Sequence, residues 1–210
     1  MINNIIFDWS GTLSNDLPLV YAAVMKVFDH FRVSRISLDE FRNSYTLPYM
    51  DHARKFGITA DKETLDGVFA QHFRASGFPQ PLPGVERVLQ QLKSSGKKMI
   101  VLSSHRQEFL DEEAARFFNS NHGHGPYFEK LFGSVHNKED AILPVIKAVG
   151  FIPSETIIVG DTEHDIMAGH KVGLFTAAVL TGYRPKEKLV IAKPHFILND
   201  ISELLKLGIF

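Results

Sequence analysis

The stretch that decides the fold is Ile5-Ile6-Phe7-Asp8-Trp9-Ser10-Gly11-Thr12-Leu13. Its first three residues are the apolar run of a short buried strand, and Asp8 follows at once. Gly11 and Thr12 then predict a tight loop that leaves the carboxyl end of this strand. Because open parallel sheets bind their ligands at the carboxyl ends of strands, chemistry is expected at Asp8. An aspartate there is suited to act as a nucleophile or to hold a divalent cation.

The composition is that of an ordinary globular protein. Hydrophobic residues are 44% of the chain and charged residues 22%, and the formal net charge of -1 offers no electrostatic footprint for nucleic acid or anionic lipid. The absence of cysteine excludes disulfides, thiolate metal sites and a cysteine nucleophile, and it fits a reducing compartment. No secretory signal and no membrane-spanning run are expected. We therefore expect a cytoplasmic protein that binds neither nucleic acid nor membrane, with no prediction of its oligomeric state.

The chain changes character near residue 80. Before it, residues 15–80 carry apolar side chains at helical spacing, and Ser37-Leu38-Asp39-Glu40 has the form of a capping box. A linker rich in Pro and Gly follows at residues 77–84. Beyond it, strands are expected at residues 98–102, 132–135, 156–159 and from 175, with helices between them. This alternation predicts βαβ units and a parallel sheet covered on both faces.

Polar residues follow four of the expected strands, where a parallel sheet brings them together. They are Asp8 with Ser10 and Thr12, Ser103, Lys138, and Asp161 with Asp165. Asp8 is suited to attack phosphorus, and Asp161 and Asp165 offer oxygen ligands to a hard cation such as Mg²⁺. Ser103 and Lys138 are suited to orient and neutralise phosphoryl oxygens. Taken singly, such a serine is usually a turn former and such a lysine is usually solvated, so the prediction depends on their joint occurrence.

A polar loop at residues 119–126 contains His122 and His124, each followed by a glycine. Two histidines can indicate a metal site. Without a carboxylate beside them they are more typical of solvated side chains.

The motifs resemble those of the haloacid dehalogenase superfamily along essentially the whole chain. Asp8-Trp9-Ser10-Gly11-Thr12 is similar to its first motif, Ser103 to the second, Lys138 to the third, and Gly160-Asp161 with Asp165 to the fourth. Two further stretches look like the phosphoglycolate phosphatase branch: Pro83-Gly84-Val85 and Leu180-Thr181-Gly182-Tyr183-Arg184.

The resemblance implies an α/β fold, with a three-layer, Rossmann-like parallel-sheet core at residues 1–14 and 81–210 and an inserted helical cap at residues 15–80. It implies a Mg²⁺-dependent hydrolase, in first place a phosphatase of a small phosphorylated metabolite, in which Asp8 forms an aspartyl-phosphate. The implied catalytic residues are Asp8, Ser10, Ser103 and Lys138. The implied metal ligands are Asp8, the Ser10 carbonyl, Asp161 and Asp165. The residues expected at the substrate are Thr12, Ser104 and His105 in the core and Arg42, Tyr49 and His52 in the cap.

One position departs from the pattern of the family's phosphatases. These carry a second aspartate two residues after the nucleophile, which protonates the leaving alcohol and then activates water. Here the residue is Ser10, whose hydroxyl cannot ionise usefully near neutral pH. This leaves open a protein that binds a phosphorylated ligand without turning it over.

Two other activities stay open at this point. The first motif is also similar to that of the phosphonoacetaldehyde hydrolases, which lack the second aspartate and cleave a C–P bond with a cap lysine. In this chain the matching position, beside Asp51-His52, is Tyr49 or a near neighbour and holds no lysine. The other activity is a haloacid dehalogenase that needs no Mg²⁺, against which Asp161 and Asp165 argue.

Overall fold

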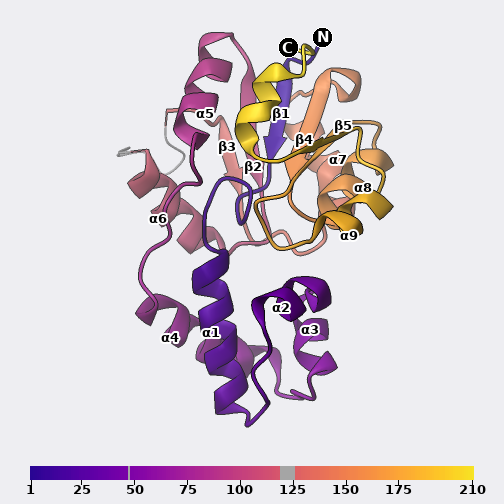
Figure 1. Cartoon of the computed structure of the whole chain (residues 1–210). Coiled ribbons are helices and arrows are strands. Elements are labelled where there is room, and N and C mark those ends of the chain that lie inside the picture. The colour runs from indigo at the N-terminus through magenta and orange to yellow at the C-terminus, as the bar shows by residue number, and fades with distance from the viewer. Residues whose placement is uncertain (47, 119–125) are drawn as a thin grey trace. The chain divides into compact units, whose positions relative to one another are not determined.

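The structure is a computed structural model that describes residues 1–46, 48–118 and 126–210, so His122 and His124 lie outside the described residues. It divides into two compact units (Figure 1). The core unit comprises Met1–Asn15 and Gln80–Phe210, and the helical unit comprises Asp16–Pro79. The division expected from the sequence differs from these boundaries by one residue at each end.

The core unit is built on one six-stranded sheet in the order β3-β2-β1-β4-β5-β6, and every paired strand is parallel to its neighbour. The strands are β1 (Asn4–Phe7), β2 (Lys98–Leu102), β3 (Lys130–Phe132), β4 (Thr156–Gly160), β5 (Phe175–Val179) and β6 (Phe196–Leu198). The central strands β1 and β4 are buried along their whole length, which explains the apolar runs at residues 5–7 and 157–159 within them.

The register of the central strands sets where the chemistry lies. Phe7 pairs with Val101 of β2 and with Val159 of β4. The next residue, Asp8, donates its backbone N–H to the Val159 carbonyl at 2.8 Å, which extends the ladder past the end of β1. Asp161 follows Val159 by two residues, so both carboxylates leave neighbouring strands at the same edge of the sheet.

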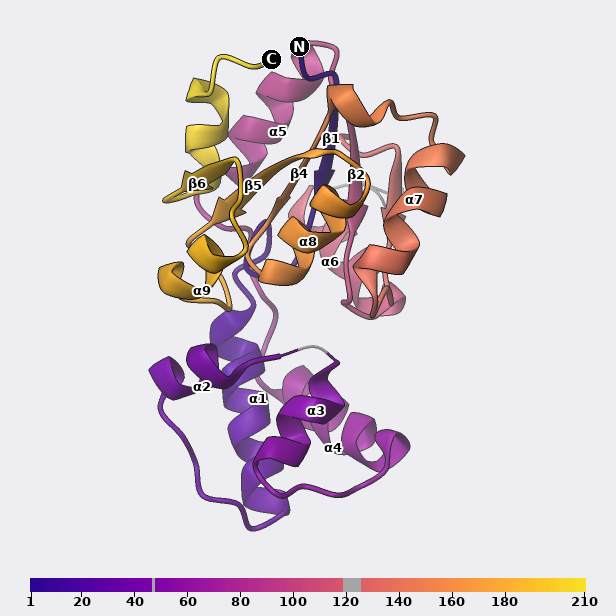
Figure 2. The same cartoon turned by 90° about the vertical axis from the view of Figure 1, so that its right-hand side faces the viewer.

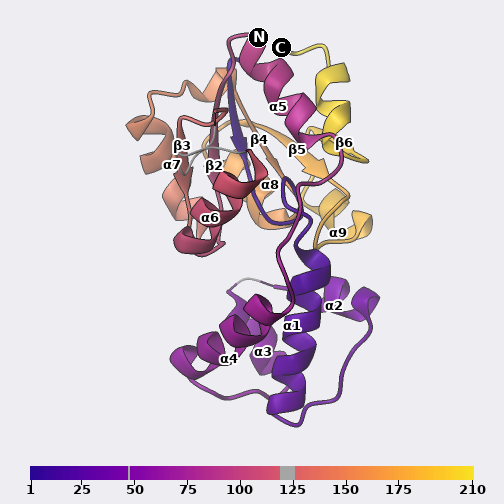
Figure 3. The same cartoon turned by 90° about the vertical axis from the view of Figure 1, so that its left-hand side faces the viewer.

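Helices cover both faces of this sheet (Figures 2 and 3). The first face carries α5 (Val85–Ser94), α6 (Gln107–Phe117) and the 3-10 helix η2 (Ile201–Lys206). The second face carries α7 (Lys138–Ala148) and α8 (Glu163–Lys171). The short helices η1 (Pro153–Glu155) and α9 (Lys186–Ile191) complete the unit. The predicted three-layer α/β fold is confirmed.

Two strands differ from the sequence prediction. β3 lies at Lys130–Phe132 rather than at residues 132–135. β6 is an additional strand that the sequence pattern does not predict. It has only three residues and forms one edge of the sheet, so its apolar run is too short to be told from a loop.

The helical unit contains α1 (Leu17–His30), α2 (Leu38–Ser44), α3 (Tyr49–Lys55) and α4 (Lys62–Ala75), and no strand among its described residues. Side-chain caps start two of these helices. Ser37 Oγ, the cap that the sequence predicts, accepts the Glu40 N–H at 3.1 Å, and Asp61 Oδ1 accepts the Thr64 N–H at 2.8 Å. The helices enclose a separate apolar core that includes Met25, Phe28 and Leu65. Within the described parts of both units, no helix has the length and apolar character required to cross a membrane.

Candidate active site

A buried ion pair marks the end of β1. Asp8 Oδ1 lies 2.8 Å from the ammonium nitrogen of Lys138, and the same nitrogen lies 2.6 Å from Asp165 Oδ1. Lys138 is the first residue of α7, whose start is fixed by Asn137, because the Asn137 side chain accepts the Asp140 N–H. Lys138 is only 5% exposed, so it differs from the solvated lysines typical of helix starts.

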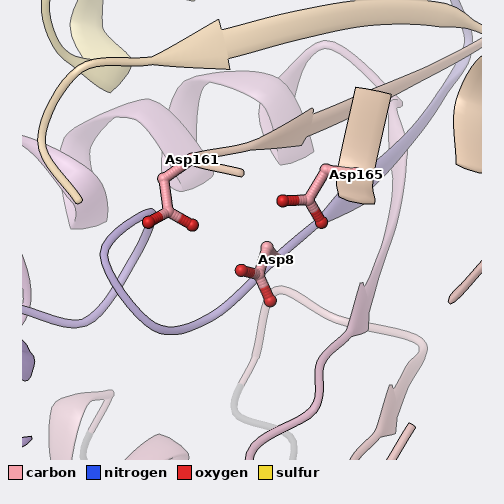
Figure 4. A group of neighbouring side chains, drawn as sticks. All are labelled: Asp8, Asp161 and Asp165. Carbon is pink, nitrogen blue, oxygen red and sulfur yellow. The ribbon is translucent and has the colours of Figure 1, made fainter. Parts of the chain in front are cut away.

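Three carboxylates converge at this place (Figure 4). Asp8, Asp161 and Asp165 each offer an oxygen atom, and these oxygens lie within 4.8 Å of one another. Asp161 follows β4 directly, and Asp165 lies in the first turn of α8. All three side chains are buried. Three acids that are far apart in the sequence therefore share one small volume at the carboxyl edge of the sheet.

The carboxylates differ in how many of their oxygens are already bonded. Asp165 Oδ1 contacts Lys138, and Asp165 Oδ2 accepts the backbone N–H and the hydroxyl of Thr162 at 3.1 and 2.7 Å. Asp161 Oδ2 accepts the Tyr183 N–H at 2.6 Å, whereas Asp161 Oδ1 is buried with no hydrogen-bond partner among the described residues. A buried carboxylate oxygen without a hydrogen-bond donor lowers the stability of the folded protein unless a ligand binds to it.

The cluster has more negative than positive charge. Burial raises the pKa of Asp8, Lys138 counteracts this, and the charge of Asp165 adds to the rise. Burial, and then the charges of Asp8 and Asp165, raise the pKa of Asp161 well above its usual range. Burial by itself would lower the pKa of Lys138, but Asp165 and Asp8 outweigh it and raise that pKa. A hard divalent cation fits this set of oxygen donors, because it would compensate the excess charge and bind Asp161 Oδ1.

The other predicted core residues lie close in sequence to these elements. Ser103 follows β2, is fully buried, and its hydroxyl accepts the His105 N–H at 3.2 Å. Thr12 is fully buried, and its hydroxyl has no hydrogen-bond partner among the described residues. Ser10, Ser104 and His105 are half-buried. The contact of Lys138 with Asp8 is present, while an approach of Ser103 to Asp8 stays a prediction.

Two of the three predicted substrate residues of the helical unit, Tyr49 and His52, have partners inside that unit. The Tyr49 hydroxyl donates to Asp66, and Arg42 is half-buried. His52 is 5% exposed and packs edge-on against Phe56, with ring centroids 5.2 Å apart. These contacts are typical of packing, and a role of the three residues in substrate binding stays a prediction.

Sequence reasoning missed Glu113, which joins the loops after β1 and β2. This carboxylate is 1% exposed and accepts the Trp9 indole N–H at 2.7 Å, the Ser14 hydroxyl at 3.3 Å and a ring N–H of His105 at 3.0 Å. A signal existed, since Glu113 lies three residues after Leu110 on the buried stripe of α6. The acid therefore occupies a core position and connects the first two motifs.

The comparison with known proteins identifies the family. The sequence profile described as haloacid dehalogenase-like hydrolase matches residues 5–179, a span that holds Asp8, Ser103, Lys138, Asp161 and Asp165. The chain belongs to the haloacid dehalogenase-like hydrolase family. The resemblance inferred from the motifs and the prediction of an enzyme are thereby confirmed.

Haloacid dehalogenase-like relatives with phosphatase names align with almost the whole chain. A phosphoglycolate phosphatase of Aquifex aeolicus is 30% identical, over 97% of this chain and 95% of its own length. A putative pyrophosphatase, PpaX, of Clostridium perfringens is 27% identical, over 99% of this chain and 97% of its own length. A haloacid dehalogenase-like hydrolase of Streptococcus pneumoniae has a similar fold, with a TM-score of 0.81, 21% identity and coverage of 98% of this chain and 97% of its own.

Proposed function

We propose that this hydrolase is a Mg²⁺-dependent phosphatase that acts on a small phosphorylated metabolite. The observation that carries the proposal is the buried Asp8 carboxylate, held 2.8 Å from Lys138 beside Asp161 and Asp165. The names of the relatives support phosphoester or phosphoanhydride chemistry. A cytoplasmic location, which the lack of cysteine fits, stays a prediction.

Asp8 would act as the nucleophile. An oxygen of its carboxylate attacks phosphorus, the bond to the metabolite oxygen breaks, and the metabolite leaves as an alcohol once that oxygen takes up a proton. Water then attacks the phosphorus of the aspartyl-phosphate, which releases inorganic phosphate and restores Asp8. Lys138 stabilises the negative charge that develops on the phosphoryl oxygens, because its ammonium already lies beside the attacking carboxylate.

The cation would be held by the Asp8 carboxylate, Asp161 Oδ1 and the main-chain carbonyl of Ser10. Mg²⁺ bound there supplies charge neutralisation between the phosphoryl group and the carboxylates. Asp165 fits a supporting role, because both of its oxygens are bonded to Lys138 and Thr162. Asp165 thus orients Lys138, and Asp161 has its Oδ1 atom available to bind the ion.

We also propose that the helical unit, residues 16–79, is a cap that selects the substrate. Its apolar core is its own, so it can hold its loops, where binding residues are commonly found, on a stable scaffold. Substrate access and exclusion of water are the usual tasks of such a unit.

The proposal is tested by phosphate release from a panel of metabolites that includes phosphoglycolate and inorganic pyrophosphate. The assay is run with Mg²⁺ and with a chelator, and Asp8→Asn is the matched variant, because it keeps the side-chain shape and removes the nucleophile. Mg²⁺-dependent release that is absent in Asp8→Asn is the expected result. If the wild type binds a metabolite but releases no phosphate from it, the protein is a binding protein. The presence of Ser10, where the family's phosphatases carry an aspartate, leaves this outcome open.

A further inference from the structure

The segment after β5, Leu180 to Arg184, touches both halves of the candidate site. The Thr181 hydroxyl donates to the Gly11 carbonyl at 2.7 Å, in the loop that follows Asp8. Two residues later, the Tyr183 N–H donates to Asp161 Oδ2 at 2.6 Å. One short segment therefore bonds the loop of the nucleophile and the carboxylate that follows β4.

Glycines allow this segment to come close. A Cβ atom placed on Gly182 would lie 2.0 Å from Asp161 Oδ2, and one placed on Gly11 would lie 2.6 Å from the same oxygen and 2.7 Å from Gly182 Cα. Gly11 also has a φ of +70°, which side-chain-bearing residues rarely adopt. The two backbones thus pack directly against the Asp161 carboxylate, and little room remains for it to rotate.

An ion pair fixes the far end of the same segment. Arg184 bonds Glu163 through two parallel contacts, Nε to Oε2 at 2.7 Å and a terminal nitrogen to Oε1 at 2.5 Å. The Arg184 side chain is only 8% exposed. Glu163 is the first residue of α8 and lies two residues after Asp161. The pair therefore joins the end of the segment to the same turn that carries Asp161, with the geometric specificity of a forked contact.

We propose that Thr181 and the Arg184–Glu163 pair are positioning residues that set the affinity of the site for its divalent cation. The inference rests on the proposed function, since it concerns the cation held by Asp161. With Oδ2 held by Tyr183 and the segment fixed at both ends, Oδ1 is presented to the ion in one orientation. Groups that hydrogen-bond a metal ligand, as the Tyr183 N–H bonds Asp161, commonly change metal affinity about 10–100-fold when they are lost, and Thr181 and Arg184 hold this donor in place.

The test is calorimetric titration of Mg²⁺ into the purified full-length protein. Thr181→Val keeps the shape but removes the donor, and Thr181→Ser keeps the donor. Arg184→Met keeps much of the buried stem but removes the fork. We expect Mg²⁺ binding about 10–100-fold weaker in Thr181→Val and Arg184→Met, and near the wild-type value in Thr181→Ser.

A matched control is the exposed pair of Lys171 with Asp140, which are 3.0 Å apart in the same unit. Lys171→Met should leave Mg²⁺ affinity unchanged. Each variant is also melted without Mg²⁺, so that lost affinity is compared only among folded proteins. If Arg184→Met does not fold, the comparison of Thr181→Val with Thr181→Ser decides.

The outcomes separate this inference from the proposed function. Folded Thr181→Val and Arg184→Met that bind Mg²⁺ as tightly as the wild type would overturn the inference alone. A wild-type protein that does not bind Mg²⁺ would overturn the proposed function and the inference with it. Weaker binding in folded Thr181→Val with recovery in Thr181→Ser would support a positioning role, because the melting control restricts the comparison to folded proteins.

Discussion

Lys138 Nζ lies 2.8 Å from Asp8 Oδ1, and both side chains are less than a tenth exposed. The lysine therefore supplies, from the chain itself, part of the positive charge that the clustered aspartates require. Buried pairs of this kind are costly to break from one side, because the remaining charge loses its partner without regaining water.

Lys138→Ala should lower the free energy of unfolding by about 3–5 kcal/mol, since it leaves Asp8 and Asp165 without their shared cation. It should also weaken binding of inorganic phosphate. Chemical denaturation and phosphate titration measure the two effects. Lys171→Ala, which breaks an exposed pair, should change the unfolding free energy by less than about 1 kcal/mol. If both variants change the unfolding free energy equally, the ion pairs of Lys138 contribute no more to stability than those of an exposed lysine.

Asp161→Asn should make stability less dependent on pH. The pKa of Asp161 is raised in the folded state above its unfolded value of 3.8. Its contribution to the stability of the folded protein is therefore fully present below pH 3.8 and is lost as the pH rises through the folded-state pKa. Without Mg²⁺, the melting temperature of Asp161→Asn should therefore exceed that of the wild type by a margin that grows from pH 4 towards neutrality.

Addition of Mg²⁺ should then reverse the order in this pair of proteins. Mg²⁺ raises the melting temperature of the wild type by binding the folded state, and it should leave Asp161→Asn unchanged. A constant difference between the two proteins across the pH range would show that folding does not raise the pKa of Asp161.

Gly182→Ala should distort the site, because the new Cβ would lie 2.0 Å from Asp161 Oδ2. We expect a loss of about 1–3 kcal/mol in stability and weaker Mg²⁺ binding. Gly67→Ala is the control, since Gly67 lies in α4 and the added Cβ would meet no atom of the described residues within 4 Å beyond the local backbone of the helix and the two chain neighbours. Gly67→Ala should stabilise the protein by up to about 1 kcal/mol. If Gly182→Ala keeps the wild-type stability and Mg²⁺ affinity, the backbone of Gly182 does not pack directly against Asp161.

Glu113→Ala should destabilise the core, because it removes the acceptor of the Trp9 indole N–H. A buried donor left without an acceptor costs about 1–3 kcal/mol. The neighbouring Glu112→Ala is the control, since Glu112 forms an exposed pair with Arg116 at 2.7 Å. It should change stability by no more than about 0.5 kcal/mol. Denaturation of both variants gives the comparison, and similar losses would mean that the buried contacts of Glu113 contribute little.

Ser10→Asp tests whether the missing acid limits turnover. The wild type should hydrolyse an aryl phosphate faster than an alkyl phosphate, because the aryl leaving group needs no proton. General acid–base help is worth about 10²–10⁴-fold, so Ser10→Asp should raise alkyl-ester turnover by a sizeable part of that range. Rapid turnover of alkyl esters by the wild type, with no gain in Ser10→Asp, would mean that another group supplies the proton.

Much of the site could be predicted because its residues follow strands. Asp8, Ser103 and Asp161 come directly after apolar runs, and a parallel sheet brings such positions to one edge. The spacing of apolar residues does not show which carboxylate oxygens are already hydrogen-bonded. The sequence therefore could not predict that, within the described parts of the chain, both oxygens of Asp165 are bonded while Asp161 Oδ1 is not. Glu113 was missed because it follows two other acids and looks like part of a solvated face.

The position of β1 in the middle of the sheet also affects how the chain is made. Asn4 donates a side-chain hydrogen bond to Thr156, 152 residues later, and β1 pairs with β4 throughout its length. At a synthesis rate of about 5–20 residues per second, the apolar β1 would wait on the order of 8–30 s for this neighbour. During translation the β1 backbone groups that pair with β4 lack this partner, and we expect the apolar side chains of β1 to be open to chaperone binding until the β4 segment leaves the ribosome.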